Sequence, residues 1–163
     1  MTPEQSYREY VAGNLERLRR TAFLLCGDWH TADDLASTVL VKLYRHWRRV
    51  ARFDNLDAYV RRMLMRAWLD ERRRPWRREA ATETLPESAA PGPDADRRLA
   101  VLSLLGTLPP RRRAVLVLRY FCDLSVEETA EAMGCSEGTV KSQTARALES
   151  LRADLSEGEA SWI

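Results

Sequence analysis

Apolar residues in the first part of the chain recur at steps of three and four, which is the spacing of one face of an α-helix. The first series predicts a helix over about residues 6–26 that ends at Gly27, because glycine accepts the left-handed conformation common after a helix. The second series predicts a helix over about residues 32–49, with Thr31 and Asp34 as a capping-box-like start. The apolar positions of the two series are Tyr7, Val11, Leu15, Leu18, Ala22, Leu25, Leu35, Val39, Leu43 and Trp47.

A third helix follows, and a segment without periodicity comes after it. Asn55 can cap this helix, its apolar positions from Tyr59 to Trp68 face inward, and Pro75 ends it. Residues 76–96 are rich in Ala, Pro, Glu and Ser and show no burial period, which is typical of a flexible linker. The sequence therefore predicts two helical units joined by a tether.

Helical spacing returns after the linker. Leucines at three-residue steps mark a helix that ends before the Leu-Pro-Pro sequence, and Pro110 suits the first turn of the next helix. The apolar positions of these two helices are Leu99, Leu102, Leu105, Val115, Leu118 and Phe121.

The strongest local signal lies between residues 125 and 148. A helix-turn-helix needs a small residue where its helices cross, a turn residue that accepts positive φ, and an aliphatic anchor on its second helix. Ala130, Gly134 and Val140 have this spacing, and a capping serine precedes each helix. The second helix is predicted to run to about Asp154. The capping and underside residues are Ser125, Glu128, Ser136, Thr129, Met133 and Leu148.

These patterns predict an all-α fold with two small helical domains. Seven Gly, seven Pro and few β-branched residues outside Thr and Val leave little material for hairpins in 163 residues. The expected boundaries are a first domain at 1–75, the linker at 76–96, a helix-turn-helix domain at 97–155 and a frayed tail at 156–163.

The formal net charge of +2 conceals an uneven distribution of basic and acidic residues along the chain. Residues 45–78 contain twelve arginines and four acidic residues, a net charge of +8, whereas residues 99–163 carry a net charge of −2. A basic block of this kind suggests a polyanionic partner, although an ordinary solvated helix face would show the same charges. Aromatic residues of the first domain could stack on unpaired bases, but helical spacing favours core positions for Trp47, Tyr59 and Trp68.

The second helix of the helix-turn-helix exposes side chains that can reach base edges and phosphates, and Ser136 opens it with free backbone amides. A helical hairpin with a polar outside is the plainer alternative. The acidic balance of this half implies that affinity for DNA must come from elsewhere, in part from the basic first domain. The exposed polar residues are Glu137, Thr139, Lys141, Ser142, Gln143 and Arg146.

Other classes of protein are disfavoured. No apolar run is long enough for a membrane span, and the N-terminus has no signal-sequence pattern, so a soluble cytosolic protein without membrane insertion is expected. The three cysteines form no CxxC pair, which favours a reducing compartment over a disulfide framework. We expect them to be small residues of the core. Sparse candidate ligands, such as Cys26 and His30, and the lack of a phosphate-binding loop predict no metal, cofactor or nucleotide. An enzyme using Cys26 or the Asp33–Asp34 pair would lack a base and nucleophile constellation.

The chain resembles the extracytoplasmic-function (group 4) sigma factors of the sigma-70 family from about residue 6 to 154. The resemblance lies in ADDLASTVLVKLYRHW, in AYVRRMLMRAWLDERRR, in the Pro-rich linker, and in LPPRRRAVLVLRYFCDLSVEETAEAMGCSEGTVKSQTARALESLR. LRRTAFLLCGD and GTVKSQTARAL are similar to the actinobacterial sigma-E-like subgroup. A free-standing helix-turn-helix repressor or activator is the competing interpretation, but the chain has no obvious dimer seam.

The resemblance implies a cytoplasmic bacterial initiation factor, not an enzyme, that binds core RNA polymerase and promoter DNA and that an anti-sigma factor commonly holds inactive. Contacts with the β′ clamp helices are implied for Asp34, Leu35, Ser37, Thr38 and Lys42, and the β flap is a further implied polymerase contact. Recognition of the −10 element is implied for Phe53, Asn55, Arg61, Arg62 and Arg66. Recognition of the −35 element is implied for Arg119, Thr139, Lys141, Ser142, Gln143 and Arg146.

Overall fold

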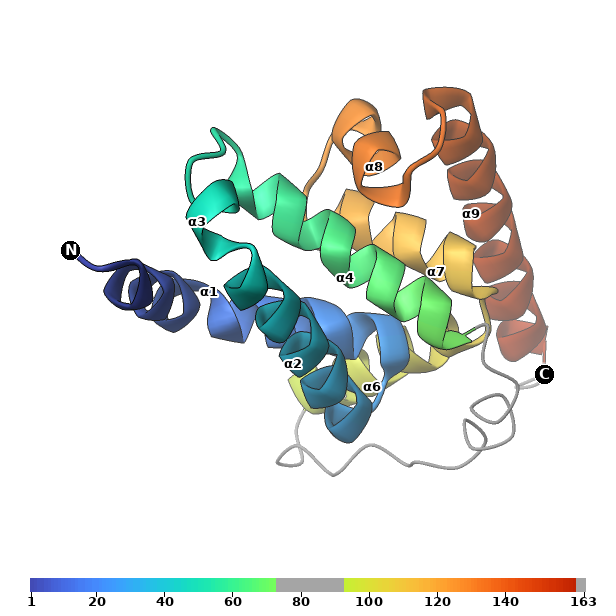
Figure 1. Cartoon of the computed structure of the whole chain (residues 1–163). Helices are drawn as coiled ribbons and strands as arrows, with labels where there is room; N and C mark the ends of the chain where they lie inside the picture. The colour runs from blue at the N-terminus through green and yellow to red at the C-terminus, as the bar shows by residue number, and fades with distance from the viewer. Residues whose placement is uncertain (73–92, 161–163) are drawn as a thin grey trace.

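The computed structural model describes residues 1–72 and 93–160, and its elements there are all helices, which confirms the predicted all-α class. An N-terminal unit contains α1 (Pro3–Cys26), α2 (Trp29–Arg45), α3 (Trp47–Val50) and α4 (Leu56–Arg72). A C-terminal unit contains α6 (Pro93–Gly106), α7 (Pro110–Leu116), the π-helix η1 (Val117–Phe121), α8 (Val126–Met133) and α9 (Glu137–Ala160). Figure 1 shows α4 crossing the middle of the molecule, with α1 and α2 below it. In the same view α8 lies above α4, α7 behind it and α9 to its right.

The helices of the N-terminal unit begin earlier than the apolar pattern alone predicts, because their caps lie outside it. Thr2 and Gln5 form a reciprocal capping box, so α1 begins at Pro3 rather than at about residue 6. Asp28, not Thr31, caps α2 by accepting hydrogen bonds from the amides of His30 and Thr31 at 3.2 and 3.1 Å.

The predicted second helix is in fact two helices. The helix is interrupted at His46, whose φ of −110° and ψ of 11° lie outside the helical range. The chain turns at this residue, and α3 begins in a new direction. Trp47 fixes this corner, since it is 6% exposed and donates from Nε1 to Ser6 Oγ at 2.8 Å. Asn55 caps α4 as predicted, accepting from the amide of Ala58 at 3.0 Å, whereas Pro75 lies outside the described residues.

The C-terminal unit departs from prediction in three places. Residues 93–96, expected in the linker, form the first turn of α6, and the rest of that linker lies outside the described residues. The last helix continues to Ala160, past the predicted end at Asp154 and through much of the expected tail. Phe121, expected to face inward, is 49% exposed, because the wider π turn of η1 rotates it away from the apolar face of α7.

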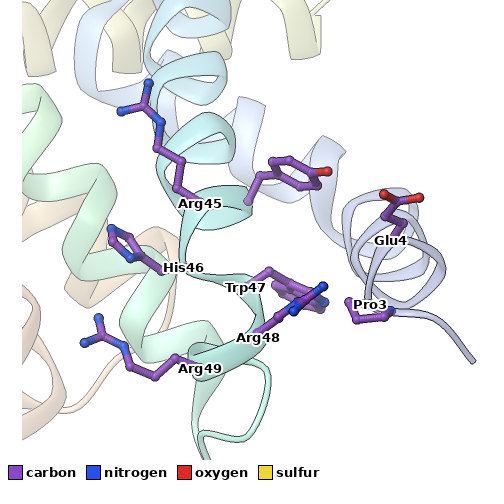
Figure 2. A pocket seen from close by; sticks show the side chains of 8 residues that line it. Pro3, Glu4, Arg45, His46, Trp47, Arg48 and Arg49 are labelled. Carbon is purple, nitrogen blue, oxygen red and sulfur yellow. The ribbon is translucent and has the colours of Figure 1, made fainter.

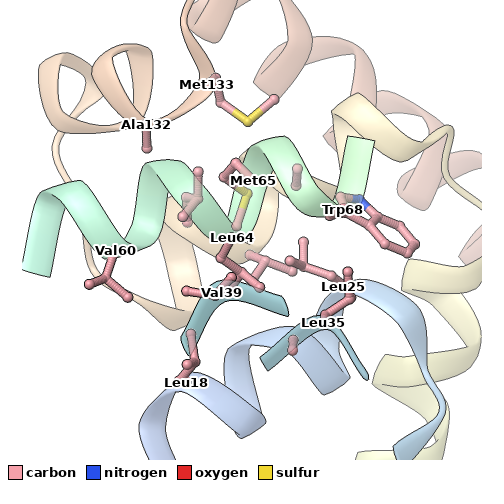
Figure 3. Close-up of a cluster of buried hydrophobic side chains, with 14 of the residues drawn as sticks. Leu18, Leu25, Leu35, Val39, Val60, Leu64, Met65, Trp68, Ala132 and Met133 are labelled. Atoms are coloured by element: carbon pink, nitrogen blue, oxygen red, sulfur yellow. The ribbon is translucent and has the colours of Figure 1, made fainter. Parts of the chain in front are cut away.

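One continuous apolar core joins the two units. Its fully buried members come from α1, α2, α3 and α4 in the N-terminal unit and from α7, η1 and α9 in the C-terminal unit. Figure 3 shows the N-terminal part of this core, with Leu25, Val39 and Leu64 together beneath α4. Among the described residues, no helix has the length and apolar character needed to cross a membrane.

Candidate nucleic-acid and polymerase interface

The helix-turn-helix predicted from sequence is formed by α8 and α9. Ser125 and Glu128 complete a capping box at 3.0 Å in each direction, which fixes the start of α8. Gly134 ends α8 with φ 66° and ψ 37°, the left-handed conformation that the turn requires. Ser136 then accepts a hydrogen bond from the amide of Thr139 at 3.1 Å and opens α9.

The two faces of α9 have different partners. Val140 and Ala147 are completely buried and anchor the helix against its own unit. Lys141, Ser142 and Arg146 are exposed on the opposite half, where they are available to a ligand. Of the six residues predicted to be exposed on this helix, Glu137, Lys141, Ser142 and Arg146 are exposed, whereas Thr139 and Gln143 are half-buried.

Three of the six residues implied for −35 recognition are half-buried. Gln143 lies about 200° around the helix from Lys141 at 100° per residue, and it is half-buried. Its Oε1 accepts a hydrogen bond from Nε of Arg112 in α7 at 3.3 Å. Arg119 folds back so that its Nη1 donates to the carbonyl oxygen of Leu124, which ties down the loop before α8. Thr139 is also half-buried, with its hydroxyl 2.9 Å from that of Ser136.

The residues implied for −10 recognition gather along α4 and the turn before it. Arg62 and Arg66 are exposed, whereas Arg61 is half-buried. Phe53 is 42% exposed and meets Tyr59 edge to face, with 5.4 Å between ring centroids. These residues therefore form one surface, of which Arg61 is the least accessible part.

The residues implied for polymerase binding lie on α2. Four of the five are exposed on one side of the helix, namely Asp34, Ser37, Thr38 and Lys42. Leu35 is 3% exposed and belongs to the core, where its position in the apolar series also places it. Val41 is 53% exposed, and at 100° per residue it lies between Ser37 and Thr38 on the same face. This apolar residue outside the core series was overlooked in the sequence.

A basic corner where α2 meets α3 was also not singled out residue by residue, although its arginines belong to the basic block that the charge count found. Figure 2 shows the side chains of Arg45, His46 and Arg49 extending to one side of this corner. Arg48 extends to the other side, toward Pro3, and all four residues border a hollow of about 480 Å³ that Pro3 and Glu4 close from α1. The corner offers phosphate groups a cluster of guanidinium donors.

The residues considered for an enzymatic alternative are engaged in structural contacts. Burial raises the pKa of the Cys26 thiol to about 11, and its Sγ lies 3.1 Å from the carbonyl oxygen of Asp28. A thiol in this state is a weak nucleophile at neutral pH. Asp33 is paired with Arg19 at 2.6 Å. Within residues 1–72 and 93–160, no group of three or more His, Cys, Asp or Glu side chains could hold a metal ion.

Two family models match the two units that the structure shows. The one described as Sigma-70 region 2 matches residues 10–78, and the one described as Sigma-70, region 4 matches residues 98–151. The chain belongs to the sigma-70 family. Within that family it is an extracytoplasmic-function RNA polymerase sigma factor, a non-enzymatic protein that directs transcription initiation.

Similar proteins include sigma factors of Streptomyces and Mycolicibacterium. The chain is 40% identical over 152 residues to the RNA polymerase sigma-E factor of Streptomyces coelicolor, an alignment that covers 91% of this chain and 85% of that protein. It is 30% identical over 158 residues to an extracytoplasmic-function sigma factor of Mycolicibacterium smegmatis, covering 90% of this chain and 60% of the relative.

Solved structures share the fold at lower sequence identity. A sigma factor of Bartonella quintana, crystallised with the anti-sigma factor NepR, is 22% identical with a TM-score of 0.72, over 93% of this chain and 98% of that one. CnrH, solved in complex with the cytosolic domain of CnrY, is 23% identical with a TM-score of 0.65, over 94% of this chain and 90% of that one.

Proposed function

We propose that this sigma factor reads the −35 element with α9 and the −10 element with α4, and that it binds core RNA polymerase chiefly through α2. The exposed face of α9 carries the proposal. A helix-turn-helix with a cap at the start of each helix and left-handed Gly134 in its turn presents Lys141, Ser142 and Arg146 of α9 to solvent, which is the arrangement in which a recognition helix enters a major groove.

For the −35 element, we assign base and phosphate contacts to these three residues. Lys and Arg can donate to guanine or to phosphate oxygens, and the amides at the start of α9 can donate to a further phosphate. Gln143 and Arg119 have partners inside the C-terminal unit, at 3.3 Å from Arg112 and at the Leu124 carbonyl, so their contribution is to hold the reading helix and its preceding loop.

For the −10 element, the proposal combines α4 with the basic corner. Opening a promoter requires single-stranded bases to be trapped, which suits aromatic faces and guanidinium groups on rigid helices. Phe53 offers an exposed ring and Arg62 and Arg66 offer exposed cations. We assign phosphate contacts along the same strand to Arg45 and Arg49.

For the polymerase, we assign the β′ clamp helices to the exposed face of α2 around Val41. An apolar side chain ringed by polar groups is typical of the centre of an interface. Tyr120 and Phe121, which are 56% and 49% exposed, form an aromatic pair at the end of η1 that we assign to the β flap. We place the protein in the bacterial cytoplasm, where these partners are found.

An anti-sigma factor is the proposed inhibitor. A solved sigma factor with this fold was crystallised with the anti-sigma factor NepR, and CnrH, which has the same fold, was solved with the cytosolic domain of CnrY. The surfaces assigned to polymerase and DNA are then the surfaces an inhibitor has to cover.

Run-off transcription with core RNA polymerase tests the proposal. Adding the protein to core enzyme and a promoter library should give discrete transcripts that neither component gives alone. Tight, specific duplex binding by the chain without polymerase, together with no stimulation of transcription, would contradict the proposal and favour a free-standing regulator.

A further inference from the structure

A hollow of about 350 Å³ lies where the end of α4, the start of α7 and the middle of α9 meet. Figure 1 shows these three segments close together at the right of the molecule. Arg72, Arg111 and Arg112 line the hollow, and we call it the arginine hollow. Its volume lies at the lower end of the range for pockets that hold small ligands.

The positive charge of the arginine hollow is not balanced by acidic groups in its lining. None of the described residues that line it is an aspartate or a glutamate. Within residues 1–72 and 93–160, neither Arg111 nor Arg112 forms an ion pair with a carboxylate. The pKa of the neighbouring Arg113 is lowered to about 10, chiefly by burial and in part by repulsion from Arg72. The hollow therefore has an excess of positive potential, which attracts an anion.

Other side chains hold two of the three guanidinium groups in position. The guanidinium carbon of Arg72 lies 5.2 Å from the ring centre of Trp68, which is 3% exposed and therefore a fixed platform. Arg112 donates from Nε to Gln143 Oε1 at 3.3 Å. Among the described residues this bond leaves both Nη groups of Arg112 without a partner, so they can donate to an oxyanion. Donors that are positioned before binding lose less conformational entropy when a ligand arrives.

The rest of the lining includes an apolar wall. Leu69 contributes to it from α4, and Pro109 and Pro110 form it at the start of α7. The proline rings fix φ, so this part of the wall is rigid before a ligand binds. A bare inorganic anion would leave the apolar wall uncovered. A nucleoside diphosphate has phosphates for the arginines and a planar base that suits an apolar wall and can stack on a guanidinium plane.

Promoter DNA fits the arginine hollow less well than a small molecule does. Gln143, which lines the hollow, lies about 200° around α9 from Lys141. A duplex docked against Lys141 therefore faces the other side of the helix. The sequence also lacks a glycine-rich phosphate-binding loop, so arginine side chains would supply the donors that backbone amides supply in such loops.

We propose that the arginine hollow binds a phosphorylated small molecule of the nucleoside diphosphate class. Its phosphates contact Arg111 and Arg112, its base covers Leu69 and the two prolines, and Arg72 closes the site from the other unit. One ligand then contacts α4, α7 and α9 together and stabilises their packing. The proposal does not depend on which helix reads which promoter element.

Isothermal titration calorimetry of the full chain with ADP tests the proposal in the absence of DNA and polymerase. We expect one ADP bound per chain and roughly tenfold or greater weakening by Arg111→Glu, which places a carboxylate in the hollow. Arg111 is exposed, so this variant keeps the core intact and remains informative if Arg112→Ala perturbs the fold. Arg98→Glu, at an exposed position of α6, is the matched control with the same change of charge. Inorganic pyrophosphate should bind more weakly than ADP, because it cannot cover the apolar wall.

Modification of arginines by phenylglyoxal, mapped by mass spectrometry, locates the bound ADP. ADP should slow the modification of Arg111 and Arg112 and leave Arg45 and Arg49 of the basic corner unchanged. Protection of the basic corner alone, or equal weakening by Arg111→Glu and Arg98→Glu, would overturn the proposal. So would a wild-type chain that binds no ADP while Arg111→Glu lowers the salt slope of promoter binding by the holoenzyme, since the hollow would then contact the DNA backbone.

Discussion

Arg113 and Leu24 are 89 residues apart in the sequence, yet Nε of the arginine lies 2.8 Å from the leucine carbonyl oxygen. The bond crosses from the second helical unit to the end of the first helix of the other unit. Gly27, in the left-handed conformation just beyond that helix, lies beside the guanidinium group, and a Cβ there would be in ordinary van der Waals contact with Arg113 Nη2 at 3.4 Å. One side chain thus links helix capping and the packing of the two units.

Replacing Lys141 by alanine should weaken promoter binding by the holoenzyme while leaving the fold intact. Lys141 is exposed and the neighbouring Val140 is fully buried, so the substitution removes a ligand contact and no core contact. A base contact should cost about 1–3 kcal/mol at one promoter position, and a phosphate contact should lower the salt slope of binding by about one. Filter binding at several salt concentrations measures both.

Arg152→Ala is the matched control for this prediction, since Arg152 is exposed further along the same helix. Equal losses for Arg152→Ala and Lys141→Ala would show a general charge effect. Unchanged transcription from the Lys141→Ala, Arg146→Ala double variant at physiological salt would remove the assignment of α9 as the reading helix.

Gly134→Ala and Gly13→Ala should change stability in opposite directions. Neither added methyl group would meet an atom within 4 Å, so sterics with neighbours do not decide the outcome. Gly134 has φ 66°, which costs alanine about 1 kcal/mol, whereas Gly13 lies inside α1, where alanine is favoured by roughly 0.5–1 kcal/mol. Urea unfolding of both variants measures the difference. Destabilisation of equal size in both would contradict the turn geometry.

Val41→Glu should reduce affinity for core RNA polymerase without affecting the isolated protein. The side chain is 53% exposed, so a carboxylate there stays hydrated in the free chain but would be buried in the proposed clamp contact. A loss of more than about 1 kcal/mol, roughly fivefold in Kd, is expected for a residue near an interface centre. Val101→Glu, at an exposed position of α6, is the control. An equal loss of affinity for both variants would show that the polymerase contact is not centred on Val41.

Stability should fall at alkaline pH in part through Cys26. Burial raises the pKa of this thiol to about 11, above its ordinary value of 9.0, so the folded state holds the proton longer than the unfolded state does. The stabilisation is complete below pH 9 and is lost as pH rises through 11, at up to about 1.4 kcal/mol per pH unit.

Cys26→Ser isolates this contribution, because a serine hydroxyl can also donate to the Asp28 carbonyl oxygen but does not titrate in this range. Denaturant midpoints measured from pH 8 to 11 should decline more steeply for the wild type than for the serine variant. Parallel curves would mean that the thiol is not held in its neutral form by the fold.

Features whose causes lie within a few residues could be predicted from the amino-acid sequence. Helical periodicity predicted the apolar faces of α1, α2 and α4, and paired cap and turn residues predicted the helix-turn-helix down to Gly134 and Ser136. Such signals lie within a few residues of the structure they specify, so a single sequence contains them in full. The charge count likewise found the basic surface of the first unit.

The accessibility of other predicted functional residues depends on how the helices pack. Gln143 is turned toward Arg112, and Arg61 lies beneath α8. Each of these outcomes depends on a helix that is distant in the sequence, and periodicity within one helix does not specify which neighbour covers which face. Arg113 shows the same limit, because a guanidinium group in a basic run is expected in solvent until packing places a helix C-terminus against it.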